Sequence, residues 1–338
     1  MDKIYLLEGI YMFRPSLRGL FAMGLGLAIM TQAFDSSGAD FETWLAKFRE
    51  EAGKKGISEA TLNDGLRDLK PIPRVIELDR RQPEFTLTFD DYMKRVVTQT
   101  RIRKARERYT KHADLLRRVG ERFGVQPRFI VALWGIESDF GRLTGGFNVI
   151  PALATLAHDG RRSAFFRSQL INALTIVDQG HILANRMKGS WAGAMGQVQF
   201  MPSSFLSFAV DFDGDGRKDL WKTLEDVFGS AANYLAKSGW NGSQTWGRRV
   251  ELPEGFDAKL INFRKFRKPL AEWQAMGVRR AGGGDLPNAS FSASLVQPTE
   301  GKGPSFLIYG NYRTILKWNR SHFFALAVGR LADATVHR

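Results

Sequence analysis

The sequence predicts an α+β fold that is mainly α, with a small β-rich domain inserted near the C-terminal end. Three observations predict it. Apolar residues recur at helical spacing over most of residues 41–237, short apolar runs among Gly- and Pro-rich turns follow over residues 246–310, and a helical pattern returns after Tyr312. A chain of 338 residues with 43% hydrophobic residues can hold two or three cored domains.

The N-terminal segment predicts export. Residues 20–30 form an apolar run that is too short to span a bilayer, and the next three residues are typical of a signal-peptide cleavage site. Arg14 and Arg18 would form a positive n-region if translation began at Met12, which we hypothesise. We therefore expect residues 1–33 to be a signal peptide. An ordinary buried N-terminal helix is the alternative.

Charge and cysteine content narrow the class of protein. The 49 Lys and Arg exceed the 35 Asp and Glu, which gives a formal net charge of +14 and favours a polyanionic partner such as nucleic acid, anionic lipid or cell wall. The chain has no cysteine, so no residue after the apolar run could carry a lipid anchor. We expect a monomer that is soluble in the envelope space. The export signal and the lack of a recognisable binding motif argue against nucleic acid.

The helical patterns and the change in composition predict four regions after the signal peptide. We expect an N-terminal helical domain, a helical core, a small β-rich domain and a C-terminal helix that returns to the core. In that order they cover residues 34–100, 101–245, 246–310 and 311–338. In the β-rich region, apolar runs at residues 259–263 and 305–309 alternate with turns such as residues 282–284.

The N-terminal helical region predicts two amphipathic helices within residues 41–69. Gly56 separates them, and Ser58 supplies the start signal of the second helix. Pro71 and Pro73 are expected to end that helix, because proline cannot continue it.

A second set of helices is expected farther along the chain. One long basic helix is predicted over residues 92–123, and we expect its basic residues to face solvent, with a binding patch as the alternative. Pro127 fits the first position of another helix, and residues 128–138 are apolar on nearly every side, which predicts a buried helix. Further helical patterns cover residues 162–179, 202–210 and 224–237.

Glu137 is the candidate catalytic residue of this buried helix. Ile130, Leu133 and Trp134 precede it at helical spacing, so its carboxyl group lies on their apolar face, whereas Asp139 points elsewhere. Loss of water raises the pKa of a carboxyl group, which suits a general acid that works near neutral pH. A buried glutamate paired with an arginine for structural reasons is the alternative.

Residues 211–226 predict a calcium loop. Asp211, Asp213 and Asp215 occupy positions 1, 3 and 5, and Gly216 occupies position 6, as an EF-hand requires. Position 12 is Lys222, so an ordinary twelve-residue loop would lack its bidentate ligand. We expect a structural Ca²⁺ and no organic cofactor; an acidic turn without metal is the alternative.

Two segments carry a resemblance to a known family. The sequence WGIESDFG at residues 134–141 resembles the E-S-x-x-G segment of the lysozyme-like superfamily of wall-cleaving enzymes. The sequence GSWAGAMGQVQFMPSS at residues 189–204 resembles the second signature of the membrane-bound lytic murein transglycosylase B family. The resemblance extends from about residue 41 to residue 331, and this chain looks like a soluble, non-lipidated member of that family.

The resemblance implies a lysozyme-like helical core, a periplasmic location and peptidoglycan glycan strands as the partner. It implies lytic transglycosylation, in which the bond between N-acetylmuramic acid and N-acetylglucosamine is cut and a 1,6-anhydro sugar forms. Glycosidases commonly use two carboxylates, and no convincing second acid accompanies Glu137 in these motifs. Glu137 would therefore act first as acid and then as base.

The resemblance also implies roles for other residues. Arg161 and Arg162 match a basic pair that could clamp substrate carboxylates, with a helix-start salt bridge as the alternative. Polar and aromatic positions of the family's groove match Ser190, Gln199, Tyr234, Tyr312 and Trp318, and each aromatic residue could instead be plain core. The metal loop would close with Asp226, or alternatively Glu225, and Arg217 at position 7 joins the candidate ligands.

Departures from the family pattern affect the expected substrate contacts more than the reaction. Gln197 and Val198 stand where the best-known members carry a tyrosine and a small residue, and Trp318 stands where they carry a tyrosine.

A muramidase-type hydrolase and a non-catalytic peptidoglycan-binding protein are the alternative functions. Wall-synthesis proteins are a further class of partner that the sequence leaves open.

Overall fold

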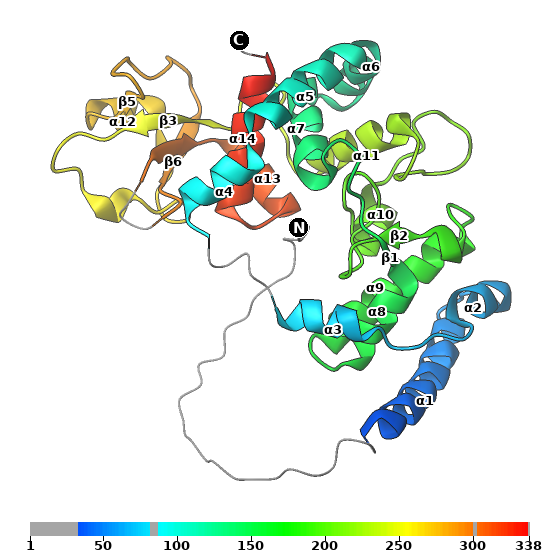
Figure 1. Ribbon diagram of the computed structural model, residues 1–338. Coiled ribbons are helices and arrows are strands. Elements are labelled where there is room, and N and C mark those ends of the chain that lie inside the picture. The colour runs from blue at the N-terminus through cyan, green and yellow to red at the C-terminus, as the bar shows by residue number, and fades with distance from the viewer. Residues whose placement is uncertain (1–32, 82–86, 300–302, 337–338) are drawn as a thin grey trace, which may run out of the picture. The chain divides into compact units, whose positions relative to one another are not determined.

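The computed structural model describes residues 33–81, 87–299 and 303–336 (Figure 1). The chain forms two compact units, and each is built from two separate stretches of chain. Among the described residues, the first unit comprises residues 33–81 and 145–206, and the second comprises residues 87–144, 207–299 and 303–336. The expected signal peptide and the start at Met12 lie outside the described residues. The domain boundaries drawn from the sequence stay a prediction.

The first unit is helical. Its helices are α1 (Ala33–Lys54), α2 (Glu59–Leu66), α3 (Pro73–Arg80), α8 (Val149–His158) and α9 (Ser163–Asp178). Helices α8 and α9 pack against each other, with α2 against α9 and α3 against α8 (Figure 1). The apolar helix α8 was not predicted, because its continuous apolar run shows no periodicity from which to choose between helix and strand.

Local signals explain where α1 and α2 end and begin. Gly56 adopts a φ of 91°, which a residue with a side chain rarely adopts, and it ends α1 as predicted. Ser58 caps α2, and its hydroxyl accepts a hydrogen bond from the backbone N–H of Thr61 at 3.2 Å. The predicted role of the prolines was wrong: α2 already ends at Leu66, and Pro73 begins α3, since proline fits the first position of a helix.

Short elements complete the first unit. Strand β1 (Phe147–Asn148) pairs antiparallel with β2 (Lys188–Gly189), and a 3₁₀ turn covers Ala184–Arg186. Helix α10 (Pro202–Phe208) follows at the boundary between the two units.

The second unit corrects one prediction. The basic pattern over residues 92–123 forms three helices, α4 (Phe89–Val96), α5 (Gln99–Lys111) and α6 (Ala113–Phe123), and not one. Thr98 begins α5, because its hydroxyl accepts a hydrogen bond from the N–H of Arg101 at 3.1 Å. His112, with a φ of −109°, separates α5 from α6.

Helix α7 (Pro127–Ser138) packs against α5, α6, α11 (Leu224–Lys237) and α14 (His322–Val336). Helix α13 (Gly310–Trp318) packs against α14. Helix α14 packs along α7, and the side chains of α7 are buried on nearly every side, as the sequence predicted (Figure 1). Among the described residues, no helix combines the length and the apolar character that a membrane crossing needs.

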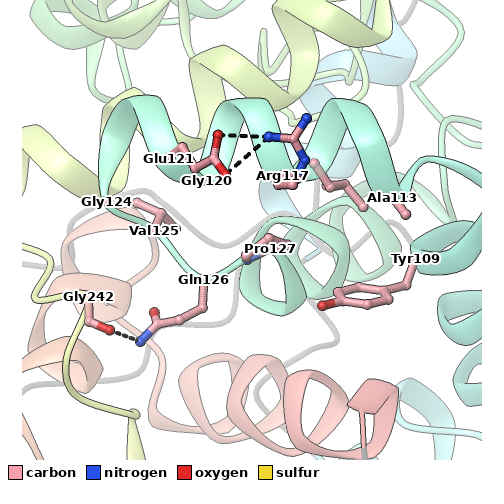
Figure 2. Close-up of a pocket in the computed structure, with 11 residues that line it drawn as sticks. Tyr109, Ala113, Arg117, Gly120, Glu121, Gly124, Val125, Gln126, Pro127 and Gly242 are labelled. Carbon is pink, nitrogen blue, oxygen red and sulfur yellow. Dashed lines mark hydrogen bonds and ion pairs between the residues drawn. The ribbon is translucent and has the colours of Figure 1, made fainter.

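The beginning of α7 is anchored by Gln126 and borders a largely apolar pocket (Figure 2). The Gln126 side-chain amide donates hydrogen bonds to the carbonyls of Gly242 at 2.5 Å and Gln244 at 2.8 Å, and its carbonyl accepts one from the Trp240 indole at 2.8 Å. This pocket lies at the end of α7 opposite to Glu137.

The predicted β-rich region contains an antiparallel sheet with strand order β4-β6-β7-β3-β5. The strands are β3 (Gly247–Glu251), β4 (Lys268–Pro269), β5 (Arg279–Arg280), β6 (Ser292–Val296) and β7 (Ser305–Ile308). Trp273 of α12 (Leu270–Ala275) is fully buried against the sheet. The apolar run at residues 259–263 does not join the sheet, because Asp257 caps a 3₁₀ turn there.

Candidate active site

Glu137 lies at the C-terminal end of α7, where the helix emerges from the core. Its side chain is half-buried, whereas its neighbours Ile136 and Ser138 are buried. The indole N–H of Trp318, the last residue of α13, donates a hydrogen bond to Glu137 Oε1 at 2.7 Å. Trp318 and Glu137 are 181 residues apart in the sequence, so the position of the Glu137 carboxyl group depends on a helix from a distant part of the chain.

Two further aromatic rings extend from the Trp318 indole that donates this hydrogen bond. The ring of Tyr234, from α11, lies 4.7 Å from the ring of Trp318, and Phe208 lies 4.4 Å from Tyr234. The Tyr234 hydroxyl donates to the carbonyl of Lys317 at 2.7 Å and so fixes the end of α13. The structure thus brings together three of the predicted site residues, Glu137, Tyr234 and Trp318.

Asp139 has a different environment from Glu137, although only one residue separates them. Its carboxylate accepts hydrogen bonds from Arg142 at 2.7 Å and Lys104 at 3.1 Å, and Arg101 lies 3.9 Å away. Burial raises the pKa of Asp139, but these hydrogen bonds and positive charges outweigh burial and hold the pKa below its usual value. Asp139 is therefore an ionised structural acid.

The residues around Glu137 form a strained turn that ends α7. Asp139 and Phe140 have φ angles of 49° and 62°, and Gly141 has 81°. Ser138 Oγ accepts a hydrogen bond from the N–H of Gly141 at 2.9 Å. A Cβ atom on Gly135 would lie 2.7 Å from the Phe140 ring, so glycine lets this ring pack against α7. The W-G-I-E-S-D-F-G segment thereby fixes where the helix ends and where Glu137 points.

Tyr312 lies elsewhere in the second unit. It has no exposed surface, and its hydroxyl pairs with Nδ1 of His322 at 2.8 Å. Burial raises the pKa of Tyr312 far above its ordinary value. This placement corresponds to the core alternative and not to a surface that a substrate could reach.

The arginine pair of the first unit binds an acid that sequence reasoning missed. Asp79 of α3 is fully buried and forms ion pairs with Arg161 at 2.9 Å and with Arg162. Burial lowers the pKa of Arg162, and Asp79 opposes that shift. The arrangement matches the helix-start salt bridge at the beginning of α9. Half of the Arg161 side chain stays exposed. Nothing in the short charged sequence of α3 distinguishes Asp79 from a surface acid.

Ser190 and Gln199 lie in one tight loop of the first unit. Ser190 is buried, and its hydroxyl accepts a hydrogen bond from the N–H of Ala194 at 3.0 Å. The Gln199 side chain donates to the carbonyl of Gly196 at 2.8 Å, and Gln199 has a φ of 50°. Both side chains therefore stabilise the backbone of the G-S-W-A-G-A-M-G-Q segment.

The acidic loop brings three of the predicted ligands together. Carboxylate oxygens of Asp211, Asp213 and Asp226 lie within 4.8 Å of one another. Calcium takes oxygen ligands at about 2.3–2.6 Å, so oxygens that share one ion lie within roughly 5 Å, and the set fits this cation. Asp226, and not Glu225, belongs to the group. Burial raises the pKa of Asp226 to about 6, and its carboxylate accepts N–H groups of Phe212 and Asp219, both at 2.7 Å.

Asp215 and Arg217 take other positions in the loop. The Asp215 side chain accepts a hydrogen bond from the N–H of Arg217 at 2.8 Å, and the Arg217 guanidinium lies 3.6 Å from the same carboxylate. Asp215 is therefore outside the group of three, and Arg217 could offer an ion only its backbone carbonyl.

The fold and the acid at the end of α7 define the class of this protein. A family model described as Transglycosylase SLT domain matches residues 40–333. The chain belongs to this lytic transglycosylase family, of the membrane-bound lytic murein transglycosylase B type, which confirms the resemblance seen in the sequence.

Particular relatives agree with this assignment. Membrane-bound lytic murein transglycosylase B of Escherichia coli (strain K12) is 32% identical over 298 residues, which cover 83% of this chain and 79% of that protein. SltB3 from Pseudomonas aeruginosa, solved in complex with NAG-anhNAM-pentapeptide, has a TM-score of 0.85 and 46% identity and covers 87% of this chain and 79% of its own. Escherichia coli Slt35, solved in complex with calcium, has a TM-score of 0.73 and 28% identity, over 91% of this chain and 98% of its own.

Proposed function

We propose that this protein is a lytic transglycosylase that cleaves the β-1,4 bond between N-acetylmuramic acid and N-acetylglucosamine in peptidoglycan and leaves 1,6-anhydromuramic acid ends. The observation that carries the proposal is the half-buried Glu137, held by the Trp318 indole at 2.7 Å. Asp139, the other acid of this segment, is bound by Arg142 and Lys104 and stays ionised, so it is unsuited to proton donation. Family membership supports the same reaction.

In the proposed mechanism Glu137 acts twice. Its protonated carboxyl group first gives a proton to the bridging glycosidic oxygen, and the bond from that oxygen to C1 of the muramic acid breaks. The C6 hydroxyl oxygen of the same sugar then attacks C1, and the Glu137 carboxylate accepts the hydroxyl proton. The carboxyl group ends as it began, and no water is consumed.

Trp318 supports the second half of this cycle. An indole N–H is a donor only, so it can stabilise the Glu137 carboxylate but can accept no proton from the carboxyl group. The rings of Trp318 and Tyr234 provide flat apolar surfaces, on which sugar rings can stack. We assign these two residues to substrate positioning. Of the two arginines at the start of α9, the half-exposed Arg161 is the candidate for binding a substrate carboxylate.

Digestion of purified peptidoglycan sacculi tests the reaction. Mass spectrometry should detect muropeptides with anhydromuramic ends. Reducing ends would instead identify a muramidase-type hydrolase. Binding to sacculi without any released product would identify a non-catalytic wall-binding protein.

We also propose that the loop over residues 211–226 holds a structural Ca²⁺, with Asp211, Asp213 and Asp226 as ligands. The ion would supply positive charge between three carboxylates and would join the loop to α11, the helix that also carries Tyr234. Binding at one hundred times the dissociation constant stabilises a protein by about 2.7 kcal/mol.

Thermal unfolding with calcium and after chelation tests the metal site. Chelation should lower the unfolding midpoint by about 5 °C. Asp226→Asn should abolish this calcium-dependent difference, whereas Asp215→Asn should reduce it less, since Asp215 lies outside the group of three. An unchanged midpoint after chelation of a calcium-loaded sample would contradict the proposal.

Export to the periplasm as an unlipidated monomer completes the proposed function. N-terminal sequencing of the protein from the periplasmic fraction should find a chain that begins close to residue 34. A chain that keeps its first residues, or a cytoplasmic fraction, would contradict export.

A further inference from the structure

A positively charged pocket of about 520 Å³ lies in the second unit, between the sheet and helices α7 and α14. Its volume is in the range of pockets that take small molecules. Its charged lining comprises Arg128, Arg248, Arg249, Arg330 and Asp333. Four guanidinium groups and one carboxylate leave an excess of three positive charges.

Two of these arginines have partners in the wall of the pocket. Arg128 lies 3.4 Å from the Asp333 carboxylate and donates a hydrogen bond to Thr245 at 3.2 Å. Arg248 donates to the hydroxyl of Tyr309. The indole N–H of the buried Trp246 donates to Asp333 at 2.9 Å. Asp333 is thus already engaged by two donors.

Arg249 and Arg330 form no ion pair with any carboxylate of the described residues, since none lies within ion-pair distance of either guanidinium. Burial lowers the pKa of Arg330, the charge of Arg249 lowers it further, and Asp90 opposes both. Both side chains are still exposed to solvent at the pocket, and a bound anion would reduce the repulsion between their like charges.

We propose that this pocket binds a phosphate group carried on a small organic molecule or a lipid. A phosphate dianion offers several acceptor oxygens to guanidinium forks and offsets more of the excess charge than one carboxylate would. The site is separate from the catalytic acid, because Arg128 precedes Glu137 by nine residues of α7, roughly 14 Å along the helix axis at 1.5 Å per residue. Binding here therefore does not depend on the proposed catalytic activity.

The Trp246 indole provides a direct probe of the pocket. Inorganic phosphate and glucose 1-phosphate are titrated into the ¹⁵N-labelled full chain at constant ionic strength, with glucose as the uncharged control. Both phosphates should shift the Trp246 Nε1–H resonance saturably, and glucose should not. The Trp246→Phe variant assigns the resonance.

Paired variants separate the pocket from overall charge. Arg249→Gln with Arg330→Gln should weaken phosphate binding about tenfold or more, the loss expected from one charge-assisted hydrogen bond. Arg103→Gln with Arg118→Gln removes the same charge from exposed faces of α5 and α6 and should keep the affinity. Unchanged thermal unfolding midpoints confirm that both double variants fold.

Competing vesicles identify the source of the phosphate. Displacement of glucose 1-phosphate by phosphatidylglycerol vesicles, and not by phosphatidylcholine vesicles, supports a lipid headgroup, and binding without displacement supports a soluble phosphate ester. The proposal is overturned if the Trp246 resonance shows no saturable shift up to about 10 mM phosphate, because a dissociation constant above this concentration is too weak for specific binding. It is also overturned if both double variants lose affinity equally.

Discussion

The two segments that carry the family resemblance use their side chains differently. In residues 134–141, Glu137 is half-buried and accepts a hydrogen bond from an indole N–H, while Ser138 and Asp139 stabilise the turn that ends α7. In residues 189–204, Ser190 and Gln199 bind the backbone of their own loop. The comparison teaches that two motifs of one family can have different roles. Residues 134–141 present an accessible acid, whereas the polar side chains of residues 189–204 stabilise a particular backbone conformation.

Removal of the acid should give the largest effect. Glu137→Gln keeps the shape of the side chain but can neither donate nor accept the catalytic proton, so turnover of sacculi should fall about a thousandfold or more. The free energy of unfolding should change by less than about 1 kcal/mol, because the position is only half-buried. Retained release of anhydromuropeptides would remove Glu137 from the mechanism.

Ser190→Ala should affect stability more than activity. It leaves the buried N–H of Ala194 without its acceptor, which should cost about 1–3 kcal/mol in urea unfolding. The folded variant should keep its rate within about threefold, and Ser203→Ala in the same segment is the matched control. A stable variant that loses activity a hundredfold would instead show that Ser190 binds substrate.

Trp318→Phe should reduce activity on the order of tenfold, since a hydrogen bond to a charged group is lost. The N–H favours the ionised carboxylate, so its removal should favour the protonated form of Glu137 that begins the reaction and move the alkaline limb of the pH-rate profile to higher pH. Trp318→Tyr restores a donor and should recover much of the rate. Equal profiles for all three proteins would mean that the indole only packs.

Asp139→Asn should give the smallest effect, a destabilisation of about 1–2 kcal/mol at pH 7, since Arg142 and Lys104 are partly exposed. The pKa of Asp139 is lowered in the folded protein, so its stabilisation is present above the pKa of the unfolded chain. It is lost as the pH falls through the folded value. Urea unfolding from pH 7 to pH 3 should therefore show the two proteins converging, and a constant difference would contradict the ion pairs.

Local signals made part of this structure predictable. The Ser58 cap, the break at Gly56 and the buried α7 follow from short-range chemistry, and the structure confirms them. The break at His112 did not follow, because no proline or glycine marks it and the helical pattern continues across it. The sheet region was predicted, but its apolar run at residues 259–263 forms a turn instead of a strand.

The sequence indicated the acid of the candidate site, but it did not indicate which residues contact that acid. Glu137 was predicted because helical spacing places it on an apolar face and because the segment around it resembles the family motif; its catalytic role stays a prediction. Its donor Trp318 lies 181 residues away, and pairing at that separation depends on how α7 and α13 pack. Asp79 was missed for the same reason, since only the tertiary fold brings Arg161 and Arg162 to it.

The order of elements has a consequence for protein synthesis. Neither unit is continuous in the chain, and α7 packs along α14, a helix that is synthesised much later than α7. A growing or truncated chain that stops before residue 322 contains Glu137 but lacks the helix that buries α7. The acid at the end of α7 therefore acquires its folded surroundings only after α14 has been synthesised.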